Sequence, residues 1–250
     1  MNAQGLTTPK KNVQQLQEKL GHAAKENKKR RFHALYDKVY RRDILWEAWR
    51  RVRANGGAAG VDELTLADIE KQGEFQFIEE CYRMLKEGKY HPSPVRRKYI
   101  PKKDGKQSPL GIPTIRDRVV QMATKIVIEP IFVVDFQETS FGFRPKRGAK
   151  QALERIRKAC NRKGNCDFQY YFDNINQEKL MKLVAMRIID RRILKLIRKW
   201  LGRQVLVAED SCIGKSVVIF PFALRAVYII LFLIGNFSVQ MALIILLWVY

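Results

Sequence analysis

Acidic side chains are scarce in this sequence. Its 250 residues contain 25 Asp and Glu against 47 Lys and Arg, which gives a formal net charge of +22. Beyond residue 200 the cations are Arg203, Lys215 and Arg225, so nearly all of the excess lies in the first 200 residues. Such a surplus binds polyanions through counterion release. It favours a nucleic acid or an anionic membrane surface as the partner, without indicating a reaction. With 46% hydrophobic residues, the chain can bury a core.

Cysteine and histidine are scarcer still. Four Cys and three His are scattered without paired spacing, which argues against a zinc site and a disulfide framework. Free thiols in a reducing cytosol are the simpler interpretation. Residues 1–31 are polar and basic and contain no apolar core segment, so a secretory signal peptide is also missing. We therefore expect a cytoplasmic protein.

The sequence has no long apolar run without charges before residues 226–250. Their length suffices for a membrane span, which needs ~20 apolar residues. Gly235, Asn236, Ser238 and Gln240 interrupt the run. We favour a frameshifted or rearranged reading frame as its origin, and membrane association through 226–250 is the alternative.

The N-terminal third predicts one clear helix. Residues 1–30, rich in Lys, Gln and Asn, are typical of a mobile or marginally helical basic arm, with structure beginning near Phe32. Asp43 is a good N-cap for a helix over 44–54, which Asn55-Gly56-Gly57 would end. The loop over 56–62 lacks the Gly-Lys-Ser/Thr ending of a phosphate loop, so we interpret it as a flexible hinge.

The middle of the chain predicts a basic hairpin. Residues 96–106 indicate a strand that runs into an Asp104-Gly105 turn, with cations crowded around the turn. These cations either protect a solvated edge against aggregation or form a finger that closes over phosphates. A helix from about 115 to 129 follows, and Pro130 would end it.

Further helices are predicted in the last part of this region. They extend over 149–160 and begin after Asn176 and after Asp190, with Gly202 ending the last one. Before them lies a basic loop over 141–148, whose two Phe side chains either stack on bases or fill a core. Residues up to about 205 therefore form one mixed α/β unit in this interpretation.

The stretch from Asp167 to Ile175 places a carboxylate at each end of an apolar-aromatic run, just before a helix start. A strand leading into a capped helix has the same pattern, so this motif is weak when taken alone. Its neighbours make it more specific. Five blocks closely resemble, in order, the reverse transcriptase/maturase proteins that bacterial group II introns encode. They are residues 35–42, 55–62, 100–106, 109–121 and 141–145.

The resemblance implies an α/β (α+β) fold with the fingers and partial palm of a right-hand polymerase, followed by an apolar C-terminal segment. Its regions are a basic N-terminal arm over 1–31, fingers over 32–145, the start of the palm over 146–205 and a divergent apolar tail over 206–250. Intron RNA and its template-primer would lie in a basic cleft, with dNTP as substrate. Two Mg²⁺ ions would be held by three carboxylates.

Site residues follow from the same resemblance. Asp167 matches the first catalytic carboxylate and metal ligand, and Phe168 matches the neighbouring residue whose backbone would approach the nucleotide and the metal. The nucleotide site would contain Lys102, Lys103, Lys106, Phe168, Tyr171 and Phe172. RNA contacts would come from Arg96, Arg97, Lys98, Arg144, Lys146 and Arg147.

The sequence also departs from the family pattern. Ser108 stands where the family usually has Arg, which removes a bidentate phosphate donor. No Tyr-Ala-Asp-Asp occurs, and beyond residue 200 Glu209-Asp210 is the one adjacent acid pair. A lone Asp does not hold two Mg²⁺ ions. We therefore expect a fragment of an RNA-directed DNA polymerase of the group II intron type that is inactive by itself. The alternatives are a non-catalytic RNA-binding protein and, less favoured, a basic tail-anchored membrane protein.

Overall fold

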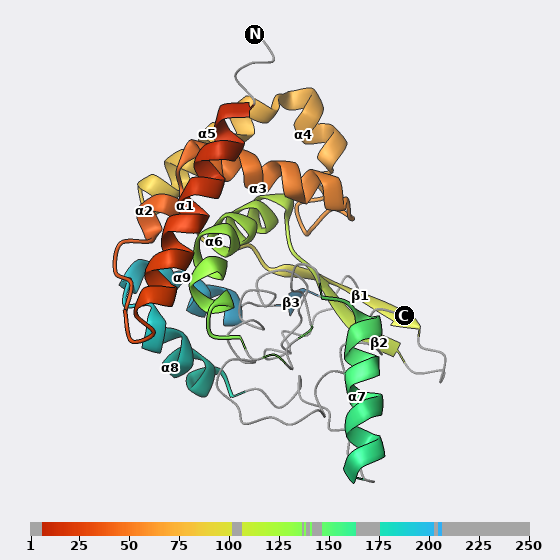
Figure 1. Cartoon of the computed structure of the whole chain (residues 1–250). Coiled ribbons are helices and arrows are strands. Elements are labelled where there is room, and N and C mark those ends of the chain that lie inside the picture. The colour runs from red at the N-terminus through yellow and green to blue at the C-terminus, as the bar shows by residue number, and fades with distance from the viewer. Residues whose placement is uncertain are drawn as a thin grey trace.

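The computed structural model describes residues 7–101, 107–136, 138, 141, 147–163, 176–202 and 205–206. Within these ranges the chain forms nine helices and one three-stranded sheet (Figure 1). The helices are α1 (Thr7–Glu26), α2 (Tyr36–Val39), α3 (Arg42–Asn55), α4 (Leu66–Gln72), α5 (Glu74–Lys86), α6 (Ile115–Val133), α7 (Ala149–Lys163), α8 (Gln177–Arg187) and α9 (Arg191–Leu201). The strands are β1 (Val95–Pro101), β2 (Gln107–Ile112) and β3 (Val205–Leu206).

Helix α6 is the centre of the helical part. Its buried side chains include Val119, Val120, Ala123, Ile126 and Val127, which point to different sides of the helix. A helix that is apolar all round has to be covered by other elements. Helices α1, α2 and α3 pack against it, and Figure 1 shows α1 and α3 beside it.

Helix α1 corrects the expectation of a mobile or marginally helical N-terminal arm. Val13, Leu16, Leu20 and Ala24 recur every three or four residues, and all four are buried in the core. Spacing of this kind places them on one helix face, which packs against α6. The charged residues between them occupy the outer face, and their abundance concealed the short apolar stripe. Residues 7–26 are therefore part of the folded core.

Pro130 lies inside α6 and does not end it, contrary to the sequence prediction. Proline lacks the N–H that would bond to the carbonyl four residues earlier, which here is the carbonyl of Ile126. The Gln17 side chain of α1 donates to that oxygen instead, with Nε2 3.0 Å from Ile126 O. The helix continues to Val133 because a neighbouring helix supplies the missing donor.

Helix α3 begins two residues earlier than predicted. Arg41 occupies the N-cap position, and Asp43 lies in the first turn, where its carboxylate pairs with Arg41 at 2.5 Å. The predicted end is confirmed, since α3 stops at Asn55 and Gly56 follows with φ +63°. Such a positive φ is accessible to glycine without steric cost.

The predicted hairpin is confirmed. Strands β1 and β2 pair antiparallel, from Arg96 opposite Ile112 to Pro101 opposite Gln107. Strand β3 adds to the other edge of β1 in parallel orientation, so the order is β2-β1-β3. The Asp104-Gly105 turn lies outside the described residues.

Both predicted helix caps near the C-terminal side are confirmed. Asn176 Oδ1 accepts the Lys179 N–H at 3.0 Å at the start of α8, and Asp190 Oδ1 accepts the Arg192 N–H at 3.0 Å at the start of α9. Among the helices of the described ranges, none is long and apolar enough to cross a membrane. Residues 226–250 lie outside those ranges.

Candidate nucleic-acid interface

Strand β1 carries three of the predicted RNA-binding residues. Arg96 and Lys98 point to one face of the sheet, while Arg97 and Tyr99 point to the other. Lys98 and Tyr99 are exposed, and both arginines are half-buried. The Arg97 guanidinium carbon lies 5.9 Å from the centre of the Tyr99 ring, and its Nε is buried without a hydrogen-bond partner in the described part of the chain. The solvent-exposed part of the half-buried Arg97 guanidinium is the part that suits a phosphate oxygen.

The roots of the two hairpin strands are tied together by Asp117. Its carboxylate is buried at the start of α6, just after β2, and accepts the Tyr90 hydroxyl at 2.5 Å and the Ser93 N–H at 3.1 Å just before β1. Thr114 caps the same helix by accepting the Asp117 N–H at 3.2 Å. A carboxylate in a buried site is stable only with such donors. The hairpin therefore projects from a fixed base.

Sequence reasoning missed Asp117. The signal was present, because Thr114 followed three residues later by an acid is a helix-start pattern. What the pattern did not reveal is that the acid turns away from the helix end. It reaches across to Tyr90 and Ser93, residues that are distant in sequence.

Arg118 holds the loop that precedes α4. Its guanidinium is buried and donates to the carbonyls of Gly56 at 3.4 Å, Ala58 and Pro113, the last at 3.1 Å. Burial lowers the pKa of Arg118, Asp62 acts in the opposite direction, and the neighbouring positive charge of Arg96 lowers it further. The loop, the hairpin and α6 thus meet around one arginine.

Two glycines allow this loop to approach α6 closely. A Cβ at Gly60 would lie 2.6 Å from Thr114 Cα, and a Cβ at Gly57 would lie 2.8 Å from an Arg118 nitrogen. The contact at Gly60 is with backbone and leaves no room for a side chain, and Gly57 has a φ of +111°, which residues with a side chain rarely adopt. The expectation of a flexible hinge over 56–62 is therefore wrong, because Arg118 and Thr114 fix the loop against the helix.

Arg147 forms local contacts. Its guanidinium donates to the Glu138 carbonyl at 2.6 Å and pairs with the Glu138 carboxylate at 3.0 Å. It also lies over the Phe141 ring, 5.5 Å from the centre. The Phe141 ring thus has a cation on one face.

All of the predicted catalytic and nucleotide-binding residues, and two of the predicted RNA-binding residues, lie outside the described residues. They are Lys102, Lys103, Lys106, Arg144, Lys146, Asp167, Phe168, Tyr171 and Phe172. In the ranges that the structure describes, no three His, Cys, Asp or Glu side chains lie close enough together to hold a metal ion. The structure thus brings together Arg96, Arg97 and Lys98 on one strand, and it adds Arg118 behind them.

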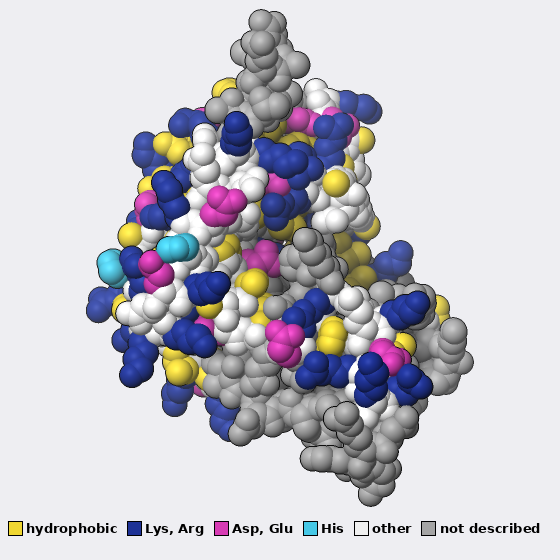
Figure 2. All heavy atoms as spheres, viewed as in Figure 1, with side chains coloured by type: hydrophobic (Ala, Val, Ile, Leu, Met, Phe, Trp, Pro, Cys, Tyr) yellow, Lys and Arg dark blue, Asp and Glu magenta, His cyan; other side chains and the backbone are white. Residues whose placement is uncertain are grey.

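Cations dominate the surface around these elements. In Figure 2, Lys and Arg side chains are spread over the visible face and far outnumber acidic ones. This agrees with 47 basic against 25 acidic residues in the whole chain. Hairpin, basic surface and overall charge all suit an extended polyanion.

Comparison with known proteins decides the family. Residues 100–220 match the family described as Reverse transcriptase (RNA-dependent DNA polymerase). The chain is 35% identical over 188 residues to the Group II intron-encoded protein LtrA of Lactococcus lactis subsp. cremoris. The chain belongs to the reverse transcriptases of the group II intron-encoded type. The resemblance of its five sequence blocks to that family is confirmed, and this family uses divalent metal ions.

The relatives of this reverse transcriptase chain are longer than the chain. The match to LtrA covers 74% of this chain and 31% of LtrA. A second relative, Protein YkfC of Escherichia coli (strain K12), is 35% identical over 199 residues, which are 75% of this chain and 51% of YkfC. The match thus spans about a third of LtrA and about half of YkfC.

The fold prediction is confirmed by a solved structure. A chain of the "Partial Cas6-RT-Cas1--Cas2 complex" superposes with a TM-score of 0.51 and covers 79% of this chain and 34% of its own length. The two share 18% sequence identity, so this likeness concerns the fold alone. The described part of this reverse transcriptase chain is mostly helical with few strands.

Proposed function

We propose that this chain supplies the fingers over 32–145 and the start of the palm over 146–205 of an RNA-directed DNA polymerase that acts on group II intron RNA. The observation that carries the proposal is the basic β1–β2 hairpin in a chain of this family, held at its root by Asp117. A fixed base keeps the β1 cations Arg96, Arg97 and Lys98 in a defined place. Preorganised cations bind phosphates at a smaller entropic cost than mobile ones.

Template RNA is the ligand of the strand cations in this proposal. Lys98 is exposed, and Arg97 is half-buried. Both groups donate to phosphate oxygens and carry no base preference. Arg96 would bind phosphate from the face of the sheet opposite to Arg97, and it lies near the buried Arg118.

The dNTP site of the proposal consists of Lys102, Lys103 and Lys106 at the hairpin turn, with Phe168, Tyr171 and Phe172 from the palm. Asp167 and the backbone of Phe168 would hold Mg²⁺, the ion that we expect from the family. Such an ion neutralises charge on the reacting phosphates when it is bound. An oxygen donor set of this kind fits a hard cation. The carboxylate pair of a complete site is not present as Tyr-Ala-Asp-Asp in this sequence.

An RNA-binding titration tests the proposal. The full chain is titrated against a structured RNA and against a mixed-sequence RNA at salt concentrations from about 50 to 200 mM. We expect affinity to fall steeply and linearly on logarithmic axes, with similar slopes for both RNAs, because phosphate contacts release counterions. An affinity that stays constant over this range contradicts the proposal.

A further inference from the structure

Two basic runs that are far apart in sequence meet on one surface. Lys28-Lys29-Arg30-Arg31 follows α1, and Arg191 begins α9. The Phe32 N–H donates to Arg187 O at 2.8 Å, and the Ile189 N–H returns a bond to Phe32 O at 2.7 Å. The Leu35 N–H donates to Asp190 Oδ2 at 2.9 Å. Each run therefore lies a few residues from the same set of backbone bonds.

Arg187 fixes the shape of the first run. Its guanidinium is buried and donates to backbone carbonyls at the end of α1 and in the run itself, including Ala24, Asn27 and Arg30. Its Nε pairs with Asp135 at 2.9 Å. Backbone oxygens thus turn inward toward Arg187, while the side chains from Lys28 to Arg31 are exposed.

The second run continues as a stripe along α9. Arg191, Lys195 and Arg198 are four and three residues apart, so they lie on one helix face. All three are exposed, whereas Ile193, Ile197 and other apolar residues of the helix are buried. From the first to the last, the stripe is ~10 Å long, since each residue rises about 1.5 Å. Within the described ranges, none of the ion pairs involves these three cations.

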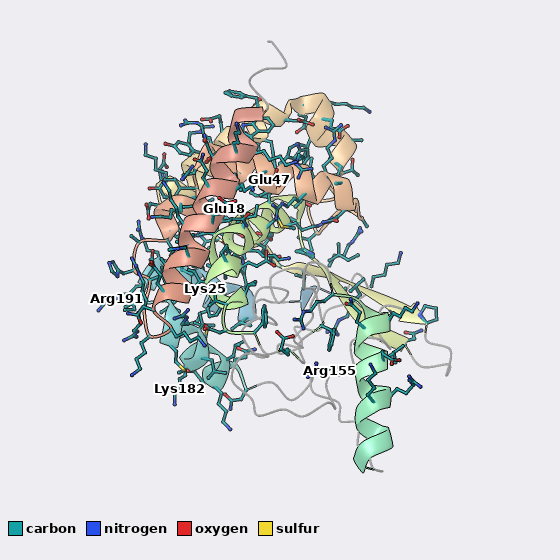
Figure 3. All side chains as sticks on the ribbon, in the orientation of Figure 1. Glu18, Lys25, Glu47, Arg155, Lys182 and Arg191 are labelled. Carbon is teal, nitrogen blue, oxygen red and sulfur yellow. The ribbon has the colours of Figure 1, made fainter. Side chains whose placement is uncertain are left out.

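The surface lies apart from the far end of the molecule that carries α7. Figure 3 shows Arg191 and Lys182 pointing outward on one side of the molecule, together with Lys25, and Arg155 of α7 on the other side. We name this surface the α9 basic surface and define it by Lys28, Lys29, Arg30, Arg31, Arg191, Lys195 and Arg198. Cations gathered at one place repel one another unless an anion lies over them.

We propose that the α9 basic surface binds the phosphate backbone of structured RNA, as a second RNA contact in addition to the β1–β2 hairpin. This inference rests on the proposed function. Phe32 and Tyr36, the Phe and Tyr residues next to the first run, are buried, so neither offers a ring on which bases stack. Phosphates and 2′-hydroxyls of a double-stranded region are then the groups within reach.

Charge neutralisation on α9 tests this proposal in the full chain. The test variant is Arg191→Gln/Lys195→Gln/Arg198→Gln, which keeps helix-forming residues and leaves Arg187 and Asp190 in place. The matched control is Lys71→Gln/Arg83→Gln/Lys86→Gln, which removes the same charge from exposed positions on α4 and α5. A second test variant, Lys28→Gln/Lys29→Gln, changes the loop run and no residue of a helix. Kd for a hairpin RNA is measured at several salt concentrations, and thermal unfolding checks the fold of each variant.

We expect the α9 variant to raise Kd about tenfold or more at moderate salt and to lower the salt slope by about two to three, one for each lost phosphate contact. The loop variant acts in the same direction, and the control stays within about twofold of the unchanged chain. Equal losses in test and control variants, or an unchanged Kd in both test variants, overturn the inference while RNA binding itself stands. A chain that binds no RNA overturns the proposed function as well. If the test variants bind phosphatidylserine vesicles more weakly but keep their RNA affinity, the α9 basic surface binds membrane and not RNA, and the inference is overturned.

Discussion

The Gln17 side chain completes a hydrogen bond that Pro130 cannot make. Gln17 Nε2 lies 3.0 Å from the carbonyl oxygen of Ile126, the group that residue 130 would bind in an uninterrupted helix. The two partners are 109 residues apart. Helix α6 therefore depends on α1 for its regularity, and α1 depends on α6 for burial of its apolar face.

Gln17→Leu is expected to lower the free energy of unfolding by about 1–2 kcal/mol, because the Ile126 carbonyl is left without a donor. In a Pro130→Ala background the same change is expected to cost less than half as much, since the introduced alanine supplies its own backbone N–H. Urea denaturation of the four proteins in a double-mutant cycle measures the coupling. Equal costs in both backgrounds would show that Gln17 does not substitute for the missing N–H.

Glu47 is expected to make stability sensitive to acid. Hydrogen bonds from Arg50 and Arg51 outweigh burial and lower the pKa of Glu47 from 4.5 to about 2. A lowered folded-state pKa means that this stabilisation is complete above pH 4.5 and is lost as the pH falls toward 2. This stabilisation is on the order of 1–2 kcal/mol, because solvent screening of the exposed Arg50 weakens the ion pair.

Glu47→Gln should remove this part of the pH dependence. We expect the difference in unfolding free energy between the unchanged chain and the variant to shrink between about pH 5 and pH 2.5. Thermal unfolding across that range measures it. If the difference in unfolding free energy is the same at about pH 5 and about pH 2.5, the pKa of Glu47 is not lowered by folding.

Gly60→Ala is expected to destabilise the loop over 56–62. The new Cβ would meet Thr114 Cα at 2.6 Å, which is backbone and cannot rotate away. A cost of about 1–3 kcal/mol is typical of such overpacking. Gly148→Ala is the control, because a Cβ there meets nothing within 4 Å. If both changes leave the denaturation midpoint unaltered, the loop is not fixed against α6.

Primer extension is expected to be undetectable for the 250-residue chain, since Asp167 has no adjacent acid pair of the Tyr-Ala-Asp-Asp kind in this sequence. Asp167→Asn should then leave the background unchanged. The assay uses an RNA template with a DNA primer, dNTPs and Mg²⁺. Extension that requires Mg²⁺ and disappears in Asp167→Asn would contradict this prediction. It would assign the missing ligands to Asp173, Glu209, Asp210 or a second chain.

Local chemistry determined much of this protein from the sequence alone. The caps at Asn176 and Asp190, the stop at Gly56 and the hairpin of β1 and β2 all depend on residues within a few positions of one another. Charge and the five ordered sequence blocks were enough to indicate an RNA-directed polymerase family. Properties of this kind require no knowledge of distant partners.

Tertiary structure decided the features that depend on distant partners. The core role of α1, the continuation of α6 past Pro130, the fixed loop at Gly60 and the meeting of Lys28–Arg31 with α9 each rest on contacts between remote segments. The physical reason is the same in every case. An apolar face, a buried carbonyl or a close backbone approach depends on whichever segment the fold brings near, and the local sequence carries no signal of which segment that is.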